Sequence, residues 1–130
     1  MKNGRVYDLL IEFSDFLPTL IEAAGISKPE NGIDGISFLP VLKSENIKTR
    51  ETAFVHYDPQ WGGFSKNRNR FAQTTEYKLY RDNRFFKLEN DPLEIHPLTA
   101  PSQKENEIRS KLQEILDKAE KESQWILNRK

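Results

Sequence analysis

A long amphipathic helix near the C-terminal end most constrains what this chain can fold into. Ser102 and Glu105 form the pattern of a capping box, in which two side chains satisfy the free backbone N–H groups of a helix start. About 25 residues of helical character follow. Their apolar side chains recur along one stripe, at Ile108, Leu112, Ile115, Leu116, Ala119 and Ile126. A helix with a single apolar stripe must bury it against another element, so the rest of the chain has to supply that surface.

The segments before this helix predict a small antiparallel sheet. Residues 52–57 (TAFVHY) read as a strand, and residues 70–81 read as a strand with an irregular middle. Asp82-Asn83 is a two-residue turn of residues that tolerate left-handed backbone. Residues 84–88 return as the second arm of a hairpin. We therefore expect an α+β fold in which three or four antiparallel strands pack against the long C-terminal helix.

A short helical region is predicted near the N-terminus, after a short strand or extended entry at residues 6–11. Apolar residues recur there at steps of three and four, which places on one helical face Phe13, Phe16, Leu17, Leu20, Ile21 and Ala24. Asp15 is expected to cap this helix, and Gly25 is expected to end it. Pro18 falls in the first turn, where its missing N–H is not needed. Ser37 is expected to start one or two further helical turns after a loop.

Charge and composition exclude several classes of function. The chain has 20 Lys and Arg residues and 20 Asp and Glu residues, whereas nucleic-acid binding draws on an excess of basic groups. It has no Cys, which excludes disulfides, thiolate metal sites and cysteine nucleophiles. No apolar run approaches the roughly 20 residues of a membrane span. We therefore expect no nucleic-acid partner and no membrane span.

Several short motifs follow one another in a characteristic order. They are Asp15-Phe16-Leu17-Pro18-Thr19, Ala24-Gly25-Ile26, Asp34-Gly35-Ile36-Ser37, Arg70 with Tyr77-Lys78-Leu79, and Asp91-Pro92-Leu93-Glu94. In order and spacing they resemble the C-terminal region of formylglycine-dependent, arylsulfatase-like sulfatases of the alkaline phosphatase superfamily. Two positions depart from that pattern: Lys87 replaces a usual acidic residue, and His96-Pro97-Leu98 replaces Asn-Leu. By the rules for caps and turns, the Asp15 and Asp91 motifs are interpreted as architecture rather than chemistry.

The resemblance implies a parent enzyme that hydrolyses sulfate esters, with carbohydrates as a candidate substrate class. Such enzymes use a formylglycine nucleophile and a divalent cation, calcium. The Cys/Ser-x-Pro-x-Arg segment that carries the formylglycine does not occur in this chain, and the family's metal-binding acidic pairs have no matching positions. We therefore expect no catalytic residue, no metal ligand and no activity from the chain alone. Parent enzymes are often periplasmic, secreted or lysosomal, but this chain carries no signal that sets a compartment.

The resemblance also divides the chain and suggests where a substrate would be contacted. Residues 1–51 would end the catalytic domain, and residues 52–130 would form a C-terminal subdomain that leans over the mouth of the pocket. His56, on the expected strand, is one candidate contact. Others combine an aromatic face for a sugar ring with cations for a sulfate, namely Trp61, Lys66, Arg68 and Arg70. The simpler alternatives are a partly buried strand histidine and a solvated basic loop around a docking tryptophan.

The apolar face of the helix from Asp15 to Ala24 is expected to lack a partner within the chain. The N-terminal catalytic domain or self-association would cover it. Two other functions stay open at this point. The parent could hydrolyse phosphate or phosphonate esters, and the chain could be a non-enzymatic interaction module.

Overall fold

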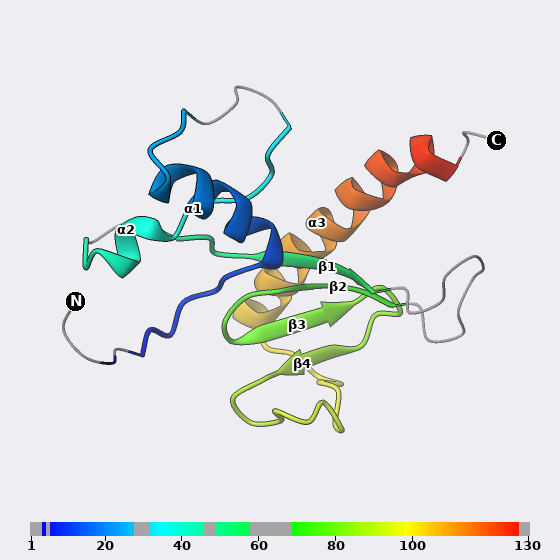
Figure 1. The fold of residues 1–130 in the computed structure, drawn as a ribbon. Coiled ribbons are helices and arrows are strands. Elements are labelled where there is room, and N and C mark those ends of the chain that lie inside the picture. Colours follow the sequence, from blue (N-terminus) through cyan, green and yellow to red (C-terminus); the bar gives the residue numbers. More distant parts are fainter. Residues whose placement is uncertain (1–3, 5, 28–31, 46–48, 58–68, 128–130) are drawn as a thin grey trace. The chain divides into compact units, whose positions relative to one another are not determined.

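The computed structural model describes residues 4, 6–27, 32–45, 49–57 and 69–127, with side chains described up to residue 122. The chain divides into two compact units, Met1–Ala53 and Phe54–Lys130. The elements in chain order are η1 (Phe13–Asp15), α1 (Phe16–Ala23), α2 (Leu39–Leu42), β1 (Ala53–Tyr57), β2 (Asn69–Gln73), β3 (Tyr77–Tyr80), β4 (Phe85–Lys87) and α3 (Gln103–Leu127) (Figure 1). The proposed assignment of residues 1–51 and 52–130 to two parts of a larger enzyme stays a prediction.

The second unit is a four-stranded antiparallel sheet covered on one face by α3 (Figure 1). The strand order is β1-β2-β3-β4, so each strand lies beside its neighbour in sequence. Ala72 of β2 is opposite Leu79 of β3, which is in turn opposite Phe85 of β4. The expected α+β fold, with its antiparallel sheet and long C-terminal helix, is confirmed.

The core of this unit lies between the sheet and α3. The sheet contributes Ala72, Leu79 and Phe85, and α3 contributes Leu112 and Leu116, all of them buried. The predicted stripe of α3 therefore faces the sheet, with Ile108 and Ile115 packed at its margins. Burying each Leu side chain stabilises the fold by about 1.5–3 kcal/mol.

The segment from residue 70 to residue 81 is two strands and not one, which corrects the prediction of a single strand with an irregular middle. The Thr74 hydroxyl accepts hydrogen bonds from the backbone N–H groups of Glu76 (3.2 Å) and Tyr77 (2.9 Å). The Thr74 N–H donates to the Tyr77 carbonyl at 2.8 Å. These bonds close a tight turn between β2 and β3 because a hydroxyl can replace a ladder partner of the backbone.

The start of α3 is as the sequence predicts, and the turn before β4 is one residue longer than predicted. The Ser102 N–H donates to Glu105 Oε2 at 2.8 Å, and the Glu105 N–H donates to Ser102 Oγ at 3.4 Å, which is the predicted capping box. The Tyr80 N–H donates to the Arg84 carbonyl at 2.9 Å, so residues 81–83 form the turn, and Asn83 has the expected left-handed conformation with a φ of 69°. Both features depend only on residues close together in sequence, and this is why they could be read locally.

Asp15 does not cap α1, contrary to the prediction. It already has helical backbone angles (φ −77°, ψ −16°) because η1 runs directly into α1, and its side chain makes no cap hydrogen bond. Its buried carboxylate instead accepts hydrogen bonds from the N–H groups of Glu12 and Ile36, each at 2.8 Å. Arg50 completes the set, since its Nε donates to Asp15 Oδ2 at 2.8 Å and a second guanidinium nitrogen pairs with Oδ1.

The remainder of the first unit is short and irregular. The entry at residues 6–11 is extended, with an isolated antiparallel bridge between Leu10 and Arg50. α2 is a single turn, and the Ser37 hydroxyl accepts the N–H of Leu39 at 3.2 Å near its start. Gly25 has a φ of 69° and ends α1 as expected.

Candidate functional site

Two of the recurrent motifs, at Asp15 and at Asp34, form one joint in the first unit. Besides the Ile36–Asp15 bond, the Phe38 N–H donates to the Thr19 hydroxyl at 3.0 Å, and that hydroxyl donates to the Asp15 carbonyl at 2.6 Å. A Cβ built on Gly35 would overlap the backbone carbonyl of Ser14, so only glycine fits there. The joint therefore gives Asp15, Thr19 and Gly35 structural roles.

The Asp91-Pro92-Leu93-Glu94 motif is a turn. The Asp91 carboxylate accepts the N–H groups of Ile95 (3.0 Å) and His96 (2.7 Å). These two bonds lower the pKa of Asp91, and the bond from the His96 N–H has the largest effect. Glu94 then adopts a φ of 55°, an uncommon conformation for a residue with a side chain. The turn thereby directs Glu94 back toward the sheet.

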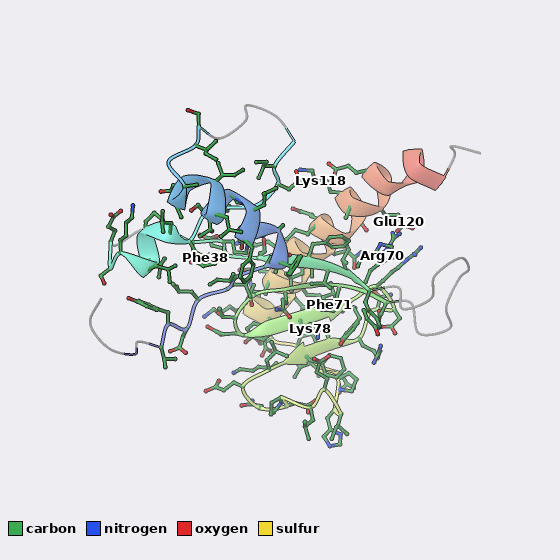
Figure 2. All side chains as sticks on the ribbon, viewed as in Figure 1. Phe38, Arg70, Phe71, Lys78, Lys118 and Glu120 are labelled. Atoms are coloured by element: carbon green, nitrogen blue, oxygen red, sulfur yellow. The ribbon has the colours of Figure 1, made fainter. Side chains whose placement is uncertain are left out.

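Glu94 meets a cluster of cationic and aromatic side chains on the face of the sheet that α3 leaves free. Its carboxylate accepts hydrogen bonds from Lys78 Nζ (2.8 Å) and from the Tyr80 hydroxyl (2.5 Å). Lys78 Nζ also lies 3.9 Å from the centre of the Phe71 ring, and Figure 2 shows these two side chains side by side on the sheet. The sequence reasoning missed this cluster, although the alternation of Lys78 and Tyr80 already placed both on one face.

The protonation states of this cluster favour architecture over proton transfer. Burial would lower the pKa of Lys78, but its hydrogen bonds to Glu94 and Tyr80 raise that pKa above its usual value. Burial, followed by the Glu94 hydrogen bond, raises the pKa of Tyr80. Lys78 is therefore a cation and Tyr80 a neutral donor at neutral pH, which suits a fixed ion pair rather than a general base.

Two of the five predicted substrate contacts lie in the part of the chain that the structure describes. His56 is exposed near the end of β1, and by alternation it shares the sheet face of Phe54, which packs on the core under α3. Arg70, near the start of β2, shares this face with buried Ala72 and is itself 6% exposed. Figure 2 shows Arg70 near the end of the sheet. The antiparallel strands therefore bring His56 and Arg70 to one face and one end of the sheet, and their role stays a prediction.

The other three predicted contacts, Trp61, Lys66 and Arg68, lie outside the described residues.

The residues that the structure describes do not fit the calcium ion implied by the resemblance. No group of three or more His, Asp or Glu side chains gathers among them. Asp15, the most buried carboxylate, is already occupied by Arg50 and two backbone N–H groups. Calcium needs six to eight oxygen ligands, so any such ion would have to be held elsewhere in the enzyme. No helix within the described ranges has the length and apolar character that crossing a membrane requires.

Comparisons with known proteins point to one family. The family model described as "N-sulphoglucosamine sulphohydrolase, C-terminal" matches residues 1–122. An arylsulfatase of Clostridium perfringens is 28% identical over 99 residues, which cover 72% of this chain and 19% of that protein. An ulvan-active sulfatase of Formosa agariphila is 30% identical over 91 residues, which cover 69% of this chain and 16% of that protein. The chain therefore spans less than a fifth of the length of these two relatives.

Solved structures agree with the sequence relatives. A 2-O GAG sulfatase aligns with 85% of this chain and 24% of its own, at 27% identity and a TM-score of 0.61. A protein in complex with its substrate D-glucosamine-2-N,6-O-disulfate aligns with 88% of this chain and 24% of its own, at 25% identity and a TM-score of 0.62. A phosphonate monoester hydrolase of Agrobacterium radiobacter shares the fold over 79% of this chain and 23% of its own, at 20% identity and a TM-score of 0.59. Together with the family match, these findings identify the chain as a C-terminal sulfatase region of the N-sulphoglucosamine sulphohydrolase C-terminal family.

Proposed function

We propose that this chain is the C-terminal part of a sulfatase-like hydrolase whose substrates are sulfate esters of carbohydrates. The family match over residues 1–122 is the observation that carries the proposal. It is supported by relatives whose names refer to a polysaccharide or a sulfated amino sugar, an ulvan-active sulfatase and the structure with bound D-glucosamine-2-N,6-O-disulfate.

Within that enzyme the chain supplies scaffold and pocket rim, and the nucleophile comes from elsewhere. The formylglycine segment Cys/Ser-x-Pro-x-Arg is absent from the 130 residues, and the buried Asp15 and the half-buried Lys78 are held in structural ion pairs. Nucleophilic attack on an ester requires an activated group in reach of the reacting atom. The chain alone is therefore expected to be inactive, and the formylglycine and calcium would belong to the N-terminal part.

The rim would be formed at the end of the sheet that carries His56 and Arg70. A guanidinium is suited to a sulfate because its planar donors match oxyanion geometry, and Arg70 is fixed by its place in β2. His56 is exposed and could bind a sugar hydroxyl or the leaving group. Trp61, Lys66 and Arg68 would extend this rim, with the indole for a sugar ring and the cations for sulfate.

The N-terminal part would dock on the apolar face of α1. Four side chains that form the outward stripe have about half or more of their surface exposed: Phe13 91%, Phe16 49%, Leu17 55% and Leu20 65%. Beside them Pro18, Ile21, Glu22, Ile26 and Ser37 line a hollow of about 210 Å³. So many neighbouring exposed apolar groups mark an interaction surface. Because these relatives extend far beyond the matched region, their catalytic part is the partner we propose for it.

The choice of ester can be tested on an enzyme assembled from this chain and an N-terminal catalytic polypeptide of the kind that we propose as its partner. We expect hydrolysis of 4-nitrophenyl sulfate to exceed hydrolysis of a phenylphosphonate monoester under the same conditions. The reverse preference would show that the assembled enzyme is a phosphonate monoester hydrolase and not a sulfatase. This is the alternative function, and the Agrobacterium radiobacter enzyme shares the fold. Binding of the two polypeptides without cleavage of either ester would favour a non-enzymatic interaction module.

A further inference from the structure

A polar groove lies between the β3–β4 turn and α3, apart from the residues considered so far. Asn83, Asn106, Arg109, Ser110 and Gln113 line it, and its volume is about 340 Å³. That volume is at the lower end of the roughly 300–1,000 Å³ of small-molecule sites. Every lining side chain carries a hydrogen-bonding group, so the groove is suited to a polar ligand.

The distinctive group of the groove is the Arg109 guanidinium. It is half-buried, and among the described residues its side chain has no ion-pair or hydrogen-bond partner. Three carboxylates close to the lining residues in sequence bind other groups, and the first of them, Glu105, accepts the Ser102 N–H at 2.8 Å. Asp82 binds Arg84 Nε at 2.8 Å, and Asp117 accepts the Gln113 amide at 2.8 Å. A permanent cation that pairs with no carboxylate of the described residues is suited to an external anion.

The other lining groups are suited to hydroxyls. The Gln113 amide nitrogen is taken by Asp117 and the Asn106 amide nitrogen by the Pro101 carbonyl at 3.0 Å, which turns their amide oxygens toward the role of acceptors. Asn83 offers both a donor and an acceptor from a turn fixed by its φ of 69°. Sugar hydroxyls both donate and accept, so they match such a set.

We infer that this groove is a second binding site for a sulfated sugar, with the sulfate on Arg109 and the sugar hydroxyls on the amides of Asn83, Asn106 and Gln113. That the ligand is a sulfated sugar rests on the proposed function. That Arg109 has no partner among the described residues does not depend on that function. The Arg81 N–H donates to the Arg70 carbonyl at 2.9 Å, so the turn that bears Asn83 begins at the end of the sheet where Arg70 lies. The groove would thus hold a part of an extended saccharide other than the ester being cleaved.

Nuclear magnetic resonance titration of the 130-residue chain tests this site without requiring turnover. The probe is N-acetylglucosamine 6-sulfate, and the references are N-acetylglucosamine and sodium sulfate. We expect the side-chain signals of Asn83 and Arg109 to shift with the sulfated sugar, at an affinity above that of either reference. Arg109→Gln should weaken this binding at least about tenfold, the effect of losing a hydrogen bond to a charged group.

Two matched variants complete the test. Lys111→Gln removes the same charge from an exposed position of α3 that does not line the groove, and it should leave binding unchanged. Asn83→Gly keeps the left-handed turn, since glycine adopts positive φ freely, and it should weaken binding of the sulfated sugar but not of sulfate. The inference would be overturned if Arg109→Gln bound the sulfated sugar as well as the wild type does, or if Arg109→Gln and Lys111→Gln lost the same affinity. It would also be overturned if the chain bound sulfate and the sulfated sugar with equal affinity. This experiment measures only binding to the groove. A negative result would therefore refute the second site without bearing on whether the assembled enzyme cleaves sulfate esters.

Discussion

At the scale of single residues, Asp15 illustrates how a family motif can be structural without serving as the predicted N-cap of α1. Its carboxylate joins η1, the backbone at Ile36 and the Arg50 side chain. Arg50 also binds Glu12 at 2.6 Å. Removing one member of a buried pair leaves the other charge without compensation, so this group should matter more than any exposed carboxylate of the unit.

Asp15→Asn should lower the stability of the first unit by about 3 kcal/mol at neutral pH. Burial would raise the pKa of Asp15, but the hydrogen bonds from Arg50, Glu12 and Ile36 outweigh it and lower that pKa below 3.8. The carboxylate therefore stabilises the fold fully above about pH 4 and ceases to do so as the pH falls through its lowered pKa. Hydrogen exchange of the α1 and α2 amides at several pH values measures both effects.

The control for this prediction is Asp34→Asn, which makes the same chemical change at an exposed position of the same unit. We expect it to leave the exchange rates nearly unchanged. Equal exchange in the two variants would show that the Asp15–Arg50 pair does not hold the unit together.

Gly35→Ala should destabilise the same unit because its Cβ would overlap the Ser14 carbonyl. Backbone atoms cannot move aside as a flexible side chain can, so we expect a loss of about 1–3 kcal/mol. Gly25→Asn is the contrasting variant, since nothing lies within 4 Å of the added Cβ and Asn tolerates left-handed backbone. The α2 amides should exchange faster in Gly35→Ala only, and comparable exchange in both variants would contradict the close packing.

At the scale of elements, α3 packs on one face of the sheet, and the turn around Asp91 contacts the other face. α3 buries Leu79 and Phe85 on one face. On the other face, Glu94 reaches Lys78 and Tyr80 from the turn that follows β4. The chain then returns along β4, where the Leu98 N–H donates to the Phe85 carbonyl at 2.7 Å.

Glu94→Gln should loosen this return segment by about 1–3 kcal/mol, because Lys78 would keep its half-buried charge without a counter-ion. Amide exchange at Leu98 is the direct readout, since that N–H is protected only while the segment lies along β4. Glu89→Gln is the matched control: Glu89 is 75% exposed and lies 3.8 Å from Lys87. Unchanged protection of Leu98 in Glu94→Gln would show that the ion pair does not fix the turn.

Elements whose causes are local could be predicted from the sequence, and those whose causes are distant could not. The capping box at Ser102, the stripe of α3 and the left-handed conformation of Asn83 depend on neighbours within a few residues. The β2–β3 turn was missed because it depends on one hydroxyl, that of Thr74, and on no Gly or Pro. The role of Asp15 was misassigned because its partners, Ile36 and Arg50, lie 21 and 35 residues away.

The candidate site shows the same division. Side chains alternate along a strand, and the structure accordingly has Tyr77 and Leu79 on one face of β3 and Lys78 and Tyr80 on the other. No sequence pattern indicated that Glu94 contacts Lys78, sixteen positions away. The contact depends on the positive φ of Glu94, and no sequence motif predicts that conformation for a Glu. The contacts expected from His56 and Arg70 depend on a partner domain, and therefore remain predictions.

At the scale of the whole molecule, the outward apolar stripe of α1 is the feature that a complete enzyme would have to cover. We expect the chain alone to self-associate through it at high concentration, as light scattering after size-exclusion chromatography would show. Leu17→Lys with Leu20→Lys should give a monomer with an unchanged circular dichroism spectrum, because both side chains are more than half exposed. Lys118→Glu, a change on the exposed surface of α3, should not affect association. A wild-type monomer at all concentrations would contradict self-association and leave docking of the N-terminal part as the remaining role for this stripe.

The most direct test is hydrolysis of 4-nitrophenyl sulfate by this chain, by an N-terminal catalytic polypeptide of the kind that we propose as its partner, and by their mixture. We expect background rates from each polypeptide alone and turnover from the mixture. The Leu17→Lys, Leu20→Lys chain should fail to restore turnover, and the Lys118→Glu chain should restore it. Turnover by the 130-residue chain alone, or no turnover by a mixture that forms a stable complex, would contradict the proposal that this chain is the non-catalytic C-terminal part of a sulfatase.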